Sequence, residues 1–179
     1  MFAVMLELLG RRNPYKQMTR DVYANVLVCV RQPKFYEEYG VPDTFDGRFD
    51  LMVLLIFLIF QRMLEEGRDE ALHFNQALFD VCFEDMDQTL REMGIGDMGV
   101  PKHMRKMMKA FNGRIHAYEQ ALAEGTLAAA LHKNLYGSAA EVDEKKIAKM
   151  AAKALEMLAF LKIQDMNAIL SGKIAFEKE

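Results

Sequence analysis

The feature that most constrains this chain is an uninterrupted apolar run of ten residues, from Leu51 to Phe60. A helix that crosses a bilayer needs about 20 such residues, so this run is too short to span a membrane. A helix that is apolar on every side is stable only where other parts of the protein cover it. We therefore expect a central, fully buried helix from about Asp46 to Glu66.

Helical patterns fill most of the remaining chain, since no segment alternates with the period of two that is typical of a strand. The further helices that we expect cover residues 19–32, 34–39, 69–93, 100–124, 126–135 and 138–170. A length of 179 residues suits one domain. The sequence predicts an all-α, single-domain helical bundle of about six to eight helices. This domain covers residues 18–171, between an apolar and basic N-terminal segment (1–17) and a C-terminal tail (172–179).

Polar residues that favour the first turn of a helix mark the expected helix starts. The candidate N-caps are Thr19, Asp43 or Thr44, Asp97, and Ser138 with Glu141 in the spacing of a capping box. Gly40 and Gly94 suit the left-handed position that follows a helix. Pro101 suits the first turn of the helix expected over residues 100–124.

That helix is amphipathic. Its apolar face is expected to consist of Met104, Met107, Met108, Phe111, Ile115, Tyr118 and Leu122. The opposite face carries Lys102, Arg105, Lys106 and Lys109, with Arg114 nearby, in a chain of formal net charge −3. These cations create a local positive field, which is either an ordinary solvated face or a surface for RNA, anionic lipid or an acidic protein. No aromatic residues interleave with them, so we predict no sequence-specific binding of nucleic acid.

Two further compositional features point to binding surfaces without deciding their role. An acidic group, Asp80, Glu84, Asp85 and Asp87, precedes the basic helix, and Asp87 has the spacing of a helical ion pair with Arg91. It is either a solvated face or a docking surface for a basic partner. The chain also has 14 methionines, whose flexible side chains suit both an irregular core and a surface for varied apolar ligands.

The residues that catalysis would require are poorly represented. Cys29 and Cys82 lie in apolar stretches without CxxC spacing, which predicts buried free thiols. A metal site in a helical bundle needs paired Glu-x-x-His elements, and this chain has one, Glu70 to His73. The glycines of residues 94–99 lack the ending of a phosphate loop. We therefore predict no enzymatic activity, no metal and no cofactor, and keep a helical carboxylate metalloprotein as the enzyme alternative.

The N-terminal segment bears on location. In residues 1–12 the apolar stretch precedes the positive charges and contains Glu7, unlike a secretory signal. This pattern favours the bacterial cytoplasm. As an alternative function, the chain is a peripheral membrane adaptor whose residues Met1 to Leu9, with Arg11 and Arg12, lie on anionic lipid. Otherwise this segment packs against the bundle.

Two stretches carry more information than helical patterning. The first is Arg31-Gln-Pro-Lys-Phe-Tyr36, followed by Val41-Pro-Asp-Thr-Phe-Asp-Gly-Arg-Phe49. The second runs Asp85-Met-Asp-Gln-Thr-Leu-Arg-Glu-Met-Gly-Ile-Gly-Asp97, then Lys102 and Phe111-Asn-Gly-Arg114. In this order and spacing, over about residues 20 to 136, the chain resembles the ubiquinol–cytochrome c chaperone family. That family includes mitochondrial assembly factors for the bc1 complex.

The resemblance implies an α-helical chaperone without known catalysis, which receives newly made cytochrome b before its assembly into complex III. The candidate partner-binding residues are the motif positions Asp43, Arg48, Asp85, Asp87, Arg91, Lys102 and Arg114, with the neighbouring cations Arg105, Lys106 and Lys109. Arg48 and Asp87 are expected in a buried polar network or on a partner surface. Lys133 departs from the family pattern, where arginine is expected.

The expected partners follow from the same resemblance. They are cytochrome b, a ribosome or anionic membrane surface, and either a small partner subunit or a second copy of the chain. In a bacterial cell the chaperone would act in the cytoplasm or peripherally at the inner membrane, whereas the eukaryotic relatives are mitochondrial. The basic helix over residues 100–124 would then meet an acidic or phosphate-rich surface.

Overall fold

The computed structural model describes residues 15–65, 69–139 and 141–178, and this part of the chain contains helices and no strand. The helices are α2 (Lys16–Val30), α3 (Lys34–Glu37), α4 (Phe45–Leu64), α5 (Asp69–Glu92), α6 (Val100–Glu124), α7 (Leu127–Asn134), α8 (Glu144–Lys162) and α9 (Met166–Leu170). The prediction of an all-α single-domain bundle is confirmed. The N-terminal segment discussed above lies outside the described residues up to position 14.

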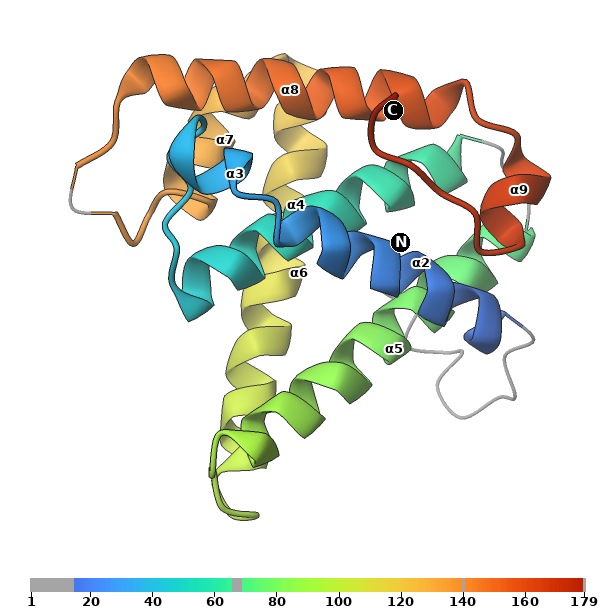
Figure 1. The fold of residues 1–179 in the computed structure, drawn as a ribbon, viewed down its shortest axis with the longest axis vertical. Coiled ribbons are helices and arrows are strands. Elements are labelled where there is room, and N and C mark those ends of the chain that lie inside the picture. The colour runs from blue at the N-terminus through green and yellow to red at the C-terminus, as the bar shows by residue number, and fades with distance from the viewer. Residues whose placement is uncertain (1–14, 66–68, 140, 179) are drawn as a thin grey trace.

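The predicted central helix is α4, which runs through the middle of the molecule in Figure 1. Every side chain from Leu51 to Phe60 is at most 2% exposed. Helices α2, α5, α6 and α8 all pack against α4, so the apolar run is covered on all sides. Burying each of these large side chains contributes about 1.5–3 kcal/mol, so α4 contributes substantially to the stability of the core.

The start of α2 differs from the sequence prediction. Thr19 was expected to cap this helix, but α2 begins at Lys16 and Thr19 lies inside it, fully buried. Its hydroxyl donates to the carbonyl oxygens of Tyr15 (3.0 Å) and Lys16 (3.1 Å). A threonine inside a helix can satisfy its hydroxyl on the preceding turn, so the residue type alone did not fix the boundary.

The prediction that Asp97 caps α6 is also wrong. Helix α6 begins after Gly99, which offers no side chain for a cap, and Pro101 lies in its first turn as expected. The carboxylate of Asp97 instead lies 2.6 Å from Nη1 of Arg91. A charged partner within reach competed with the backbone amides for this carboxylate.

The C-terminal third contains two further corrections. The capping box at Ser138 and Glu141 does not form, because α8 begins at Glu144 and Asp143 caps it by accepting from the Lys145 amide at 2.9 Å. The single helix expected up to residue 170 is broken after Lys162. Asp165 then caps α9 by accepting from the backbone N–H of Asn167 at 3.1 Å.

This break is stabilised by side chains that take over backbone groups of the last turn of α8. Arg62, buried on α4, donates to the carbonyl oxygens of Leu161 (3.0 Å) and Gln164 (3.2 Å). The side-chain amide of Gln164 binds both backbone groups of Ala175, at 2.7 and 3.0 Å. The chain after α9 is therefore fixed across the end of α8 and does not continue the helix.

Residues 171–178 form a C-terminal strap over the bundle. Phe176 is 6% exposed and belongs to the core. Glu177 accepts a hydrogen bond from Lys34 of α3, and its other oxygen lies 3.2 Å from Nζ of Lys153 on α8. These contacts with the two lysines hold the pKa of Glu177 below its usual value. The strap thus joins an early and a late helix of the chain.

Helices α5 and α6 form a hairpin whose closed end projects from the body (Figure 1). We call residues 91–109 the hairpin tip. No side chain of residues 101–110 is buried, whereas Phe111, Ile115, Tyr118 and Ala121 are. Met104 and Met107 pack against the edge of the core, but Met108, also expected on the apolar face, is 38% exposed. The hairpin extends beyond the elements that would cover Met108.

Candidate partner-binding surface

The loop over residues 41–44 is held tightly against the start of α4. Thr44, one of the two candidate caps, accepts from the Gly47 amide at 3.0 Å. A Cβ at Gly47 would lie 2.0 Å from the carbonyl oxygen of Pro42, so a glycine is required for this close approach. The loop and cap together fix the direction in which Phe45 and Phe49 leave the first turns of α4.

The candidates Asp43 and Arg48 pair with each other beside this loop. Nε of Arg48 lies 2.6 Å from the Asp43 carboxylate, and both side chains are about half exposed. The guanidinium also lies 5.3 Å from the centre of the Tyr36 ring. The hydroxyl of Tyr36 in turn donates to the carbonyl of Val30 at the end of α2. The pair therefore stabilises the loop and remains accessible to a partner.

The acidic residues of α5 mostly face α2. Asp85 accepts from the hydroxyl of Tyr23 at 2.8 Å, and burial is the main reason why the pKa of that tyrosine lies far above its usual value. Glu84 pairs with Lys16, and Asp80 accepts from Gln76 at 2.7 Å. The candidate Asp85 therefore holds α2 against α5, whereas the side chain of Glu84 stays about half exposed beside it.

Arg91 bridges two carboxylates at the start of the hairpin tip. Its Nε lies 2.6 Å from Asp87, and its Nη1 lies 2.6 Å from Asp97. The arginine thus ties the glycine-rich connection to the last turn of α5. Its side chain is 43% exposed, so a partner can still reach it.

A largely buried ion pair joins α4 to α6. Nε of Arg114 lies 2.8 Å from Oδ1 of Asp50, whose side chain is 5% exposed. Arg114 also donates to the carbonyl of Asn134 (3.3 Å), and its guanidinium lies 5.9 Å from the Phe49 ring. Burial raises the pKa of Asp50 to about 6, and the charge of Arg114 limits the rise. The buried network expected at Arg48 or Asp87 is therefore found at Asp50 and Arg114.

A groove of about 530 Å³ opens beside this pair. It is lined by the start of α4, the end of α5, the first half of α6 and the turn after α7. Its apolar lining includes Phe45, Phe49, Leu90, Met93, Met107 and Ala110, and its basic lining includes Lys106, Arg114 and Lys133. We call this the α4–α6 groove. It combines an adaptable apolar surface with a cationic rim.

A second groove, of about 370 Å³, lies on the other side of the same aromatic residues. Phe45 and Phe49 line both grooves, and the second also contains Leu27, Met52 and Asp85. Phe45 is 41% exposed, whereas Phe49 is 8% exposed. Phe45 is therefore the accessible aromatic group between the two grooves.

The comparisons with known proteins place this geometry in a family. The family model described as "Ubiquinol-cytochrome C chaperone" matches residues 37–176. This chain belongs to the ubiquinol-cytochrome C chaperone family. The match includes the loop before α4, the hairpin tip and the strap as far as Phe176.

Solved and curated relatives agree with this assignment. The crystal structure of the Cbp3 homolog from Brucella abortus is 34% identical, with a TM-score of 0.77 over 97% of this chain and 96% of that chain. Ubiquinol-cytochrome-c reductase complex assembly factor 1 of Xenopus laevis is 26% identical over 80% of this chain and 72% of its own length. Mitochondrial protein CBP3 of Saccharomyces cerevisiae is 27% identical, over 79% of this chain and 44% of its own length. The chain thus spans less than half of the yeast protein.

The two sequence stretches that resemble the chaperone family meet at the α4–α6 groove. The first supplies Phe45 and Phe49, and the second supplies Arg114. Of the other motif candidates, Asp43 pairs with Arg48 in the loop before α4, and Asp87 and Arg91 belong to the ion pairs that hold the connection after α5. Sequence reasoning missed Asp50 and Phe45 as site residues. The acid directly before the apolar run was a usable signal, because a buried carboxylate requires a partner.

Lys102, Arg105, Lys106 and Lys109 differ from the other candidates because they are exposed and belong to no ion pair of the described residues. Lys106 alone of these four also lines the α4–α6 groove. Arg114, with which they were grouped by sequence, belongs to the buried pair. The structure thus separates one anchored cation from four free ones.

The described residues offer little support for a reactive centre. Both cysteines are buried free thiols, as predicted, and burial raises the pKa of Cys29 to about 12. Within residues 15–65, 69–139 and 141–178, no three His, Cys, Asp or Glu side chains gather as metal ligands would. None of the described helices is long and apolar enough to cross a bilayer.

Proposed function

We propose that this chain is an assembly chaperone for the cytochrome bc1 complex (complex III) and that it holds an apolar segment of newly made cytochrome b in the α4–α6 groove. The family assignment and the relatives named as assembly factors of ubiquinol-cytochrome c reductase support the process. The observation that supports the site is that both family stretches line one apolar groove. No covalent bond is made or broken in this action.

The chemistry of the groove suits an unassembled membrane segment. Such a segment exposes apolar side chains to water, and covering them stabilises it by about 25 cal/mol for each Å² that is buried. Phe45 and Phe49 provide a firm aromatic wall, while Met93 and Met107 provide flexible contacts that fit varied side chains. A bound segment would cover the exposed part of the Phe45 ring and remove it from water.

The proposed place of action is the cytoplasmic side of the bacterial inner membrane, where cytochrome b is inserted. A ribosome, a small partner subunit or a second copy of the chain would act there as a further partner. These expectations rest on the resemblance to the mitochondrial relatives.

The test uses deletion of the gene in its host, followed by measurement of assembled bc1 complex and of cytochrome b. We expect both to fall, and complementation with the intact gene to restore them. Normal levels of both in the deletion strain would contradict the proposed function.

A matched pair of variants tests the site. Phe45 and Leu155 are exposed to similar extents (41% and 46%), but Leu155 lies on α8, away from the groove. Phe45→Glu should weaken binding of the segment roughly tenfold or more, through loss of the apolar contact. The glutamate lies in the first turn of α4, where a negative charge favours the helix. Leu155→Glu should restore bc1 assembly fully, and equal complementation by both variants would rule out this groove.

A further inference from the structure

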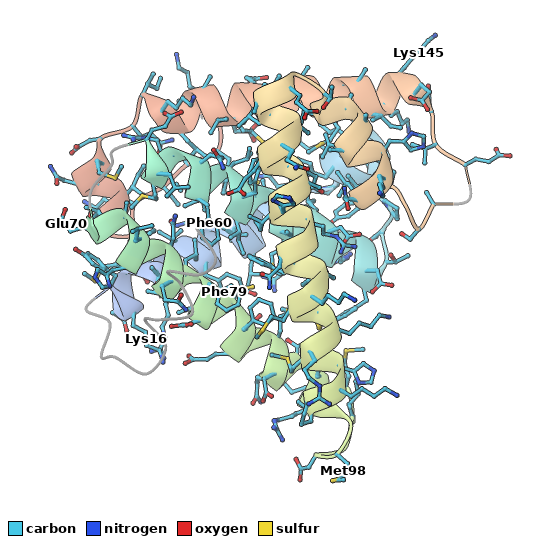
Figure 2. The ribbon with its side chains drawn as sticks, turned by 180° about the vertical axis from the view of Figure 1, so that it is seen from behind. Lys16, Phe60, Glu70, Phe79, Met98 and Lys145 are labelled. Carbon is cyan, nitrogen blue, oxygen red and sulfur yellow. The ribbon has the colours of Figure 1, made fainter. Side chains whose placement is uncertain are left out.

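The hairpin tip is largely exposed: of residues 91–109, Val100 is the one that is buried. Figure 2 shows Met98 at the end of the α5–α6 hairpin, on the opposite side of the molecule from Lys145. The tip contains three glycines, Gly94, Gly96 and Gly99, so its connection is short and carries few bulky groups. Any flat surface that the molecule meets with this end contacts the tip first.

Three large apolar side chains are exposed on or beside this end. Met98 is 95% exposed, Met93 is 59% exposed and Met108 is 38% exposed. Exposing these apolar side chains to water is unfavourable, and a partner that covers them would lower the free energy. Met98 lies outside the residues that line the α4–α6 groove, so binding of a client segment there leaves it uncovered.

Positive charge is concentrated at the same end. Residues 91–109 contain five cationic and two carboxylate side chains, in a chain whose formal net charge is −3. One carboxylate, Asp97, is paired with Arg91. Lys102, Arg105, Lys106 and Lys109 recur at spacings of three and four residues and therefore share one face of α6. They present unneutralised charge beside the exposed methionines.

We propose that the hairpin tip docks on an anionic lipid bilayer, with Met98 entering the interface and the lysines of α6 meeting the headgroup phosphates. An apolar end flanked by lysine and arginine is the combination that binds such an interface. Each lysine near an anionic surface strengthens the attraction by about fivefold. This docking goes beyond the proposed client groove and does not depend on it.

Charge alone would also suit RNA, but the neighbouring side chains favour lipid. A surface for single-stranded RNA combines cations with aromatic rings on which bases stack. From position 91 to 109 the chain carries four methionines besides Met98 and no Phe, Tyr or Trp, and its one imidazole, His103, lies within hydrogen-bonding distance of the Gly99 carbonyl. Contact with RNA phosphates would leave the methionine side chains exposed to water. A bilayer interface would remove these apolar side chains from water.

The test measures binding of the purified full chain to phosphatidylcholine vesicles with and without phosphatidylglycerol. We expect sedimentation with the anionic vesicles alone. The double variant Lys102→Glu/Lys109→Glu should bind them roughly 30-fold more weakly or worse. The matched control, Lys145→Glu/Lys173→Glu, changes the net charge equally at exposed residues away from the tip and should keep its binding. Phe45→Glu should bind vesicles normally, which separates this surface from the groove.

A second measurement reports insertion. Because Cys29 and Cys82 are buried, a single fluorophore can be attached through Met98→Cys, and its emission should shift to the blue on anionic vesicles. The same label at Lys145→Cys should not shift. Absence of vesicle binding, equal losses in the two double variants, or an unshifted label at position 98 would each overturn the proposal. So would binding of mixed-sequence RNA without binding of vesicles.

Discussion

The two halves of α6 follow the same helical periodicity in different surroundings. In the second half, Phe111 packs between α4 and α5, with ring centres 6.3 Å from Phe60 and 5.4 Å from Phe79, and Tyr118 lies 5.5 Å from Phe57. In the first half no side chain of residues 101–110 is buried. An amphipathic pattern therefore predicts which side of a helix is apolar, but the chain buries that side fully only in the second half and in part in the first.

The largest expected effect contrasts the apolar residues of the two halves. Phe111→Ala removes a ring that is 1% exposed and should lower the free energy of unfolding by about 3–5 kcal/mol. Met108→Ala, at a position that is 38% exposed, should change it by less than about 1 kcal/mol. Urea denaturation measures both, and similar losses would mean that the first half is covered in solution.

The next effect concerns the close contact between Gly47 and the loop before α4, in the body of the protein. Gly47→Ala should lower the free energy of unfolding by about 2–3 kcal/mol, because the new methyl group would overlap the Pro42 carbonyl. The same substitution should loosen the start of α4 and reduce complementation of bc1 assembly. Thermal unfolding checks the first expectation, and a variant as stable as the parent would mean that the loop can move away freely.

A third effect is the pH dependence of the free energy of unfolding, which should differ between the buried Asp50–Arg114 pair and the exposed Arg91–Asp97 pair. The pKa of Asp50 is raised to about 6 in the folded state, from about 4 in the unfolded chain. The folded state therefore binds more protons in this window, so the contribution of Asp50 to stability falls as pH rises from 4 to 6, by roughly 2 kcal/mol. Asp50→Asn should remove this fall in urea titrations at a series of pH values. Asp97→Asn, at the exposed pair, should leave it unchanged.

The smallest effect compares a glycine in open space with Gly47. A Cβ at Gly113 on α6 would meet nothing within 4 Å. Gly113→Ala should therefore raise the free energy of unfolding by about 0.5–1 kcal/mol through helix propensity. Calorimetry would show an increase of a few degrees in Tm. A loss of bc1 assembly despite this gain would indicate that a partner approaches the backbone there.

Apolar patterning was sufficient to predict most of the fold. The run Leu51–Phe60 located the central helix, and the pattern over residues 100–124 gave the bounds of α6. The helix ends were less predictable. Thr19, Asp97 and Ser138 are all residue types that favour N-caps, yet none of them caps a helix. Two of these side chains have other nearby partners: the Thr19 hydroxyl bonds the preceding turn of its own helix, and Asp97 pairs with Arg91 six residues before it.

The candidate site was predicted in outline only. The family stretches supply several residues of the groove, and Arg114 was among the candidates that they gave. However, a periodic pattern cannot reveal that Arg114 reaches Asp50, because the two residues are 64 positions apart and meet only when α4 and α6 cross. Phe45 was missed because its exposure depends on a groove built from several helices.

The C-terminal strap has a consequence for how the protein is made. Glu177 contacts Lys34 and Lys153, and Phe176 completes the core beside them. These residues are made after both of the helices that they join, so a nascent chain that still lacks them has an open edge between α3 and α8. Closure of the bundle therefore waits until this segment has been made, and a peptide inserted within the segment would open that edge again.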